Sequence, residues 1–127
     1  MPQATGNFDI TLTPTTPADS PIATMALSKT WHGDLSGTST GHMLAYRTAT
    51  EGSAGYVAME HVTATLAGRS GSFTLQHHGL MDKGAPALSV VVVPHSGTQG
   101  LTGLTGTLDI IISPGRHDYT FAYNLPG

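Results

Sequence analysis

Residues 55–66 read Gly-Tyr-Val-Ala-Met-Glu-His-Val-Thr-Ala-Thr-Leu, and this stretch decides the fold. Its apolar side chains recur with a period of two, at Tyr56, Ala58, Val62, Ala64 and Leu66. Successive side chains of a β-strand point to opposite faces of the sheet, whereas the apolar face of a helix repeats every three or four residues. The stretch therefore predicts a long β-strand with one buried face.

The same alternation recurs along the chain, and no convincing helical stripe accompanies it. The predicted strands cover residues 8–13, 22–32, 38–47, 55–66, 72–79, 87–94, 105–112 and 117–125. The connections are mostly short and rich in Gly and Pro, so neighbouring strands should pair antiparallel. Closing the sheet into a barrel would hide its edges. The sequence predicts an all-β fold, a single closed eight-stranded antiparallel β-barrel over residues 1–127, with a two-sheet sandwich as the alternative.

Composition narrows the classes of partner. The chain has 127 residues, a net charge of −3 and only five Lys and Arg residues, which are scattered. Nucleic-acid backbones and anionic membrane surfaces require clustered positive charge, so we expect neither as a partner. The chain has no Cys, which excludes disulfides and thiolate sites. The N-terminus has no signal-peptide pattern and the longest apolar run, 90–94, is too short to span a bilayer, so we expect a cytoplasmic protein.

Three ionisable residues fall on strand faces that are otherwise apolar. Lys29 is in phase with its apolar neighbours in strand 22–32, Glu60 with those of strand 55–66, and His77 with Phe73 and Leu75. A lone buried charge is costly, so such groups must pair, lose their charge or meet solvent in a cavity. Lys29, Glu60 and His77 are therefore the candidate catalytic residues.

The pattern leaves three readings of these residues open. The first is an acid–base cluster in an apolar pocket, in which Glu60 or His77 moves a proton and Lys29 polarises a carbonyl or epoxide oxygen. The second is structural, with a Lys29–Glu60 ion pair beside a hydrogen-bonded core histidine. The third is a β-bulge that reverses the strand phase and puts all three in water.

Large side chains around this cluster are expected to form a ligand pocket: Leu27, Trp31, Tyr46, Tyr56, Phe73, Leu75, Tyr119, Phe121 and Tyr123. The phase of strand 38–47 is ambiguous. If Leu44 and Tyr46 face inward, His42 does so as well; if Met43 and Ala45 face inward, Arg47 joins them.

Other motifs carry little weight. Residues 37–41 match the hydrolase pattern G-x-S-x-G, but a strand follows where the nucleophile elbow requires a helix. The glycines of 100–106 lack dinucleotide-loop spacing. The seven His show no close-spaced ligand pattern, so the sequence indicates no metal and no cofactor. A weak Leu-x-Gly repeat starts at Leu35, Leu66, Leu101 and Leu104 and predicts hairpin corners, where Gly relieves a positive φ or a bulge.

Four stretches resemble a known family: KTWHGDLSGTS at 29–39, SAGYVAME at 53–60, GRSGSFTLQH at 68–77 and VPHSGT at 93–98. They are similar to signatures of an uncharacterised bacterial family of unknown function, DUF3224, whose fold is similar to the allene oxide cyclase barrel. The resemblance implies an eight-stranded barrel. It supplies no reaction, although allene oxide cyclase and some bacterial polyketide cyclases use such barrels as apolar chambers.

We therefore expect an interior cavity for a small, largely apolar molecule. A cyclase or isomerase would hold its substrate in a folded conformer and move a proton. A binding or carrier protein would need the same cavity without the chemistry, and a structural barrel would have a filled interior. Barrels of this kind often associate, which allows a homo-oligomer, but no apolar stripe in the sequence fixes its order.

Overall fold

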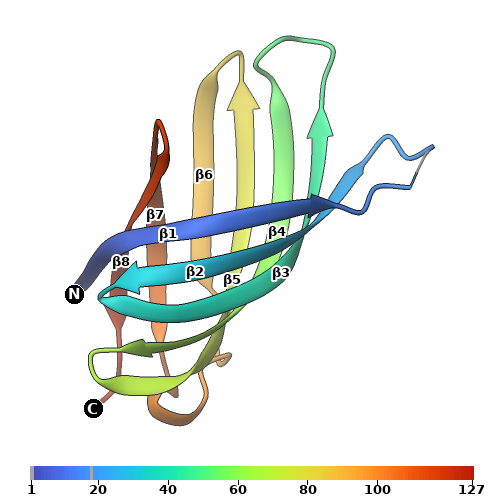
Figure 1. The fold of residues 1–127 in the computed structure, drawn as a ribbon. Helices are drawn as coiled ribbons and strands as arrows, with labels where there is room; N and C mark the ends of the chain where they lie inside the picture. Colours follow the sequence, from blue (N-terminus) through green and yellow to red (C-terminus); the bar gives the residue numbers. More distant parts are fainter. Residues whose placement is uncertain (1, 18) are drawn as a thin grey trace.

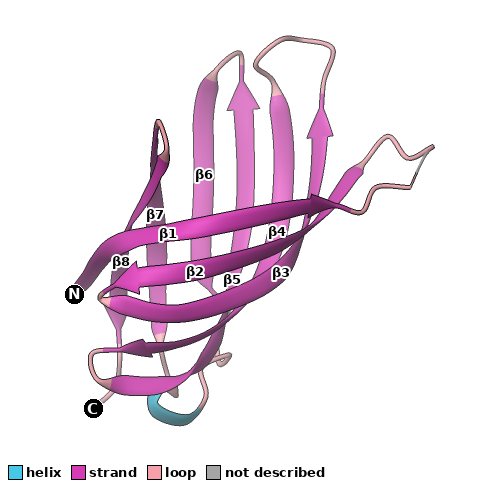
Figure 2. Cartoon of the chain, in the orientation of Figure 1, coloured by secondary structure: helices cyan, strands magenta, loops and turns pink. Residues whose placement is uncertain are grey.

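The computed structural model describes residues 2–17 and 19–127, which form a closed barrel of eight antiparallel strands with each strand beside its neighbours in sequence (Figure 1). The strands are β1 (Gln3–Pro14), β2 (Ala23–Gly33), β3 (Leu35–Arg47), β4 (Ala54–Leu66), β5 (Arg69–Asp82), β6 (Ala85–Val92), β7 (Thr105–Ser113) and β8 (Arg116–Asn124). One 3-10 turn, η1 (Gln99–Leu101), lies between β6 and β7 (Figure 2). The predicted barrel is confirmed, and the sandwich alternative is wrong.

The two ends of the barrel differ in their connections. The β1–β2, β3–β4, β5–β6 and β7–β8 hairpin turns lie at one end, which we call the tip end. The other three connections, η1 and both chain termini lie at the opposite end, which we call the base end (Figure 1). Over the described residues, no helix is long and apolar enough to cross a membrane.

The N-terminal part of β1 closes the barrel. Gln3 to Asn7 pair with Ala122 to Asp118 of β8, whereas β1 was predicted to begin only at Phe8. Gly6 interrupts the apolar alternation here, because a Cβ at this position would lie 2.0 Å from the carbonyl oxygen of His32. The close approach of β1 to β2 explains why the sequence pattern hides this segment.

Buried leucines plug the base end. Leu35, Leu66, Leu101 and Leu104, the first residues of the Leu-x-Gly repeats, are all almost completely buried. The prediction that the glycines of these repeats lie at hairpin corners is confirmed for two of the four. Gly68 and Gly103 have φ values of 76° and 84°. The other two, Gly37 and Gly106, lie inside strands, where a Cβ would meet a backbone carbonyl of the neighbouring strand.

Aromatic side chains fill the base half of the barrel above this plug. Phe8, Trp31 and Tyr119 form one contact series, with ring centroids 5.0 and 5.1 Å apart. Phe73 stacks on Phe121 at 6.0 Å. These five side chains are buried with the four leucines in one core, so the base half of the interior is closely packed.

The register of β3 settles the ambiguous strand. Leu35 and Ser39 are buried, so the odd-numbered residues of β3 face inward, among them Met43 and Ala45. Tyr46 is 48% exposed on the outer face, and its prediction as a pocket residue was wrong. The error arose because apolar residues occupy both faces of this strand, so alternation could not distinguish them.

Candidate functional site

Lys29, Glu60 and His77 lie on the inner faces of β2, β4 and β5, and they are only 4%, 0% and 4% exposed. Their predicted inward orientation is confirmed, and the alternative in which a bulge turns them toward water is wrong. Their predicted catalytic roles are not tested by this placement. Together with Ser39, they are the buried polar and charged residues in the described part of the chain, and we call these four residues the polar cluster.

The Glu60 carboxylate is the centre of the polar cluster. Its Oε1 accepts a hydrogen bond from Lys29 Nζ at 3.0 Å and lies 2.8 Å from His77 Nε2. Its Oε2 accepts a hydrogen bond from the Ser39 hydroxyl, which in turn accepts one from Trp31 Nε1 at 3.1 Å. Within the described residues, no buried side-chain nitrogen or oxygen lacks a partner. Each buried polar side-chain atom of the cluster therefore has at least one hydrogen-bond partner.

The backbone register brings these side chains together across β3. Lys29 pairs with Ser39, and Gly41 pairs with Glu60. Because Gly41 has no side chain, the inner face of β3 leaves Glu60 free to reach Ser39 and Lys29 on β2. A Cβ at Gly41 would lie 2.1 Å from the Met59 carbonyl oxygen, so the backbone of β4 also requires glycine there. Sequence reasoning rejected Ser39 together with the G-x-S-x-G match at 37–41 and did not place it in the cluster, although its phase with Leu35 could have identified it as inward-facing.

Burial and hydrogen bonding have opposite effects in the cluster. Burial lowers the pKa of Lys29 below its ordinary 10.5, although the charge of Glu60 partly counteracts this effect. Burial alone would raise the pKa of Glu60. The hydrogen bond with His77, the charge of Lys29 and the hydrogen bond from Ser39 outweigh it, and the pKa falls below 4.5. Lys29 Nζ also lies 4.5 Å from the ring centre of Phe8.

Tyr56 connects the cluster to the tip end. Its hydroxyl lies 3.5 Å from His77 Nδ1, and the side chain is half-buried. Because ionised Glu60 can only accept hydrogen bonds, His77 Nε2 must carry a proton. In the uncharged imidazole, Nδ1 is then an acceptor that faces Tyr56. Burial and the charge of Glu60 raise the pKa of Tyr56, so its hydroxyl remains a donor at neutral pH.

Beyond this level the inner face of the barrel is open to solvent. The inward-facing residues nearest the tip end are exposed or half-buried, and we call them the tip-end inner surface: Leu12, Met25, Met43, Tyr56, Met81, Leu88, Ile112 and His117. The contrast along β7 is clear, because Leu108 is 3% exposed and Ile112, on the same face, is 72% exposed.

The predicted pocket residues divide between these two regions. Tyr56 lies on the tip-end inner surface, and Tyr46 lies outside the barrel. The others are buried in the interior, where all but Leu27 belong to the packed core: Leu27, Trp31, Phe73, Leu75, Tyr119, Phe121 and Tyr123. Sequence reasoning missed the rest of the tip-end inner surface, although the same strand phase extends to it.

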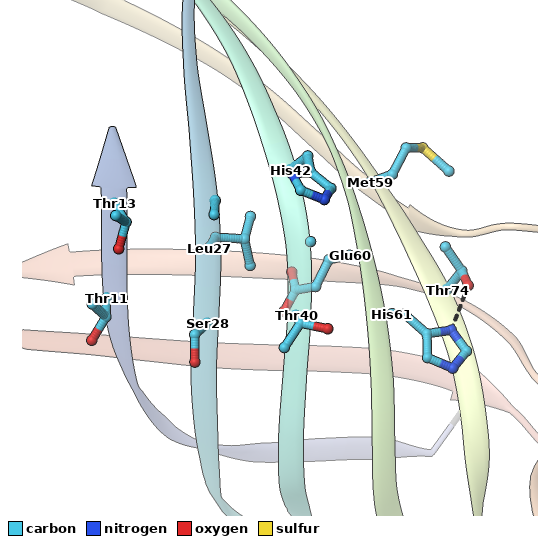
Figure 3. Close-up of a pocket in the computed structure, with 12 residues that line it drawn as sticks. Thr11, Thr13, Leu27, Ser28, Thr40, His42, Met59, Glu60, His61 and Thr74 are labelled. Carbon is cyan, nitrogen blue, oxygen red and sulfur yellow. Dashed lines mark hydrogen bonds between the residues drawn. The ribbon is translucent and has the colours of Figure 1, made fainter. Parts of the chain in front are cut away.

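Two hollows lie on the barrel wall. An open notch of about 530 Å³ separates β1 from the β7–β8 hairpin, and its lining includes Phe8, Ile10 and His117. A groove of about 500 Å³ lies outside β1 to β5, with His42, Met59 and His61 along it (Figure 3). Glu60 also lies beside the groove, but its fully buried side chain is on the inner side of the barrel wall. The groove and the polar cluster are therefore on opposite sides of the wall.

The described residues do not form a cluster of side chains that could bind a metal ion. No three His, Asp or Glu residues within 2–17 and 19–127 are grouped so that they could hold a metal ion. His77 and His78 are consecutive in β5, and only His77 faces the interior. The ionisable residues of the interior are thus arranged for hydrogen bonding to one another.

The fold and the site define this protein as a closed antiparallel β-barrel with a buried Lys–Glu–His cluster beneath an open apolar surface. The chain belongs to the DUF3224 family of proteins of unknown function, whose sequence profile matches residues 4–123. A crystal structure of a DUF3224 protein of unknown function from Shewanella oneidensis MR-1 is 47% identical and has a TM-score of 0.94. The similarity covers 100% of this chain and 98% of that one. No curated protein matches the chain.

Proposed function

We propose that the barrel binds a small, largely apolar molecule against the tip-end inner surface. One observation carries the proposal: the inward-facing residues that are large and apolar remain exposed at this end, whereas those at the base end are packed. Leu12, Leu88 and Ile112 all face inward and all exceed 40% exposure. Burial of apolar surface is favourable by about 25 cal/mol per Å², so a bound apolar molecule would stabilise this region.

The composition of the surface supports an adaptable fit. Met25, Met43 and Met81 lie on it, and methionine side chains adjust to differently shaped ligands because they are unbranched and polarisable. The notch beside β1 offers a route from solvent to the same surface. Tyr56 and His77 provide polar groups at its inner end, as is usual for small-molecule sites.

The uncharged fluorescent probe N-phenyl-1-naphthylamine tests this function, because its emission rises in an apolar site. Ile111 and Ile112 are neighbours in β7 and both are exposed, but only Ile112 faces inward. We expect Ile112→Asp to weaken probe binding about tenfold or more, and the matched control Ile111→Asp to leave it unchanged. Absence of binding by the unmodified protein, or equal loss in both variants, contradicts the proposal.

A proton-transfer isomerase is a second candidate, favoured by the hydrogen bond between Glu60 and His77. Nδ1 of His77 would take a proton from the carbon next to a ligand carbonyl, leaving an enolate and an imidazolium that Glu60 stabilises. For a ligand with a β,γ double bond the enolate is a conjugated dienolate, and return of that proton to its γ-carbon would move the double bond into conjugation and complete an isomerisation with no other reactant. Lys29 and Glu60 would then position His77 and would not touch the ligand. Because His77 is itself only 4% exposed, the ligand would have to displace the Tyr56 hydroxyl to reach its Nδ1.

Deuterium incorporation into octan-2-one in D2O, followed by mass spectrometry, tests the isomerase candidate. We expect the protein to accelerate exchange next to the carbonyl, and His77→Gln to abolish the acceleration. His78→Gln, on the outer face of the same strand, is the matched control and should retain it. Exchange at the rate of buffer alone, or loss in both variants, rules out proton transfer by His77.

A further inference from the structure

The buried interior of the barrel offers a ligand no unpaired charge within the described part of the chain. Among the described residues, Lys29 and Glu60 are the buried charged side chains, and they form an ion pair with each other. Lys29 Nζ is also enclosed by Phe8 and Trp31, whose ring centres lie 4.5 and 5.1 Å away. The paired charges sum to zero, so the polar cluster presents no net charge to the tip-end inner surface.

Tyr56 is placed to recognise an uncharged polar group. Its hydroxyl is 3.5 Å from His77 Nδ1, which is longer than the usual hydrogen-bond range of about 2.7–3.2 Å. This contact is weak, so the hydroxyl can donate instead to a ligand oxygen. A ligand hydroxyl could accept from Tyr56 and donate to His77 Nδ1, whereas a carbonyl could accept from Tyr56 alone.

A charged head group would find no unpaired opposite charge beside Tyr56 in the described part of the chain. A carboxylate at this position would approach ionised Glu60, whose single nearby cation is already bound. An ammonium would lose its hydration among methionine and leucine side chains, and burial of an unpaired charge is costly. Arg47 is in the inward phase of β3, but it is exposed at the rim of the tip end, away from the polar cluster.

We infer that the tip-end inner surface selects uncharged lipophilic molecules carrying one hydroxyl or carbonyl group, which Tyr56 binds beside His77. This inference rests on the proposed binding function and adds the chemical class of the ligand. The class includes long-chain alcohols and ketones, and it excludes fatty-acid anions and alkyl ammonium ions.

Competition against N-phenyl-1-naphthylamine at pH 7.5 tests the inference with four compounds of equal chain length: octan-1-ol, octan-2-one, octanoate and octylammonium. We expect the alcohol and the ketone to displace the probe at lower concentration than either ion. Tyr56→Phe should weaken the binding of the alcohol and of the ketone about three- to tenfold, the contribution of one hydrogen bond, each measured by displacement relative to the affinity of that variant for the probe. Tyr46→Phe, with its ring on the outer face, is the matched control and should change neither.

The outcomes separate the inference from the function beneath it. If the probe itself does not bind, the binding function fails. If the probe binds but the ions compete as well as the neutral compounds, or none of the four competes, the inference is wrong and the binding function stands. If octanoate competes best and Arg47→Gln removes that advantage, the rim charge selects the ligand and the inference is overturned. A neutral preference that Tyr56→Phe leaves intact overturns the role of Tyr56.

Discussion

The ammonium of Lys29 lies 3.0 Å from the carboxylate of Glu60, and neither side chain has appreciable contact with solvent. The pair joins β2 to β4 across the intervening β3, over a sequence separation of 31 residues. A buried ion pair recovers its desolvation cost only when the remaining donors and acceptors are satisfied. His77 and Ser39 provide those additional contacts to Glu60.

Removal of Lys29 should be strongly destabilising. Lys29→Met leaves the Glu60 carboxylate buried without its cation, and we expect a loss of about 3–5 kcal/mol in the free energy of unfolding. The double variant Lys29→Met with Glu60→Gln should lose less, because no unpaired charge remains inside. Urea unfolding measures both changes.

An exposed ion pair provides the control for this experiment. Arg116 contacts Asp118 at 2.7 Å, but its side chain is 64% exposed. Solvent screens this pair, so Arg116→Gln should change the unfolding free energy by only about 0–1 kcal/mol. Similar losses for Arg116→Gln and Lys29→Met would show that burial does not set the strength of the Lys29–Glu60 pair.

The stability of the barrel should fall in acid through Glu60. Its pKa is below 4.5 in the folded chain and returns to about that value on unfolding, so the unfolded state binds a proton more readily. The contribution of Glu60 is complete above pH 4.5 and is lost as pH falls through the folded-state pKa. We expect the stability difference between the unmodified protein and Glu60→Gln to be largest at neutral pH and to narrow below pH 4.5.

Urea unfolding from pH 7 to pH 3 measures this difference. Glu51→Gln, in the exposed β3–β4 turn, controls for the loss of one negative charge from the chain. A stability gap between the unmodified protein and Glu60→Gln that stays constant across the range would contradict a lowered pKa for Glu60.

Alternation predicted the side of the wall on which a residue lies, but not how deeply it is buried. Lys29, Glu60 and His77 were identified because each interrupts a long apolar series on one face. Leu108 and Ile112 have the same phase and similar side chains, yet only Leu108 is packed. Depth depends on which residues from other strands meet in the interior, and no single strand contains that information.

The residues that sequence reasoning missed share a physical cause. Ser39 is a small polar residue whose burial is explained only by two partners on other strands, Trp31 and Glu60. Gly6 and Gly41 were not interpreted because their importance lies in the close approach of neighbouring backbone. Tyr46 was misplaced since β3 carries large apolar residues on both faces. The position of each of these residues depends on contacts between segments that are distant in sequence.

Ser39 should contribute to stability through two hydrogen bonds at once. Ser39→Ala removes the acceptor of Trp31 Nε1 and a donor to Glu60, and it leaves the indole N–H buried without a partner. We expect a loss of about 1–3 kcal/mol in the free energy of unfolding. Ser36→Ala, on the exposed face of the same strand, should have little effect. Equal effects of the two substitutions would show that the chain of hydrogen bonds adds no stability.

Tyr119 should hold the base end of the barrel closed. Its hydroxyl accepts a hydrogen bond from the Leu35 backbone N–H at 3.0 Å and donates to the His32 carbonyl at 2.9 Å. These bonds fix β8 to the β2–β3 turn, and Gly6 leaves room for them, because a Cβ there would lie 2.7 Å from the hydroxyl oxygen. Tyr119→Phe should therefore cost about 1–3 kcal/mol, since the Leu35 N–H would lose its acceptor.

Tyr123 is the matched control for this substitution, because it lies on the same face of β8 and only the hydroxyl of Tyr119 bonds the β2–β3 turn among the described residues. Tyr123→Phe should leave the free energy of unfolding nearly unchanged. Hydrogen exchange distinguishes the local effect, since the Leu35 amide should exchange faster in Tyr119→Phe and not in Tyr123→Phe. Unchanged protection of Leu35 in both variants would mean that water replaces the tyrosine hydroxyl, so that packing of the ring, and not its hydrogen bonds, closes the base end.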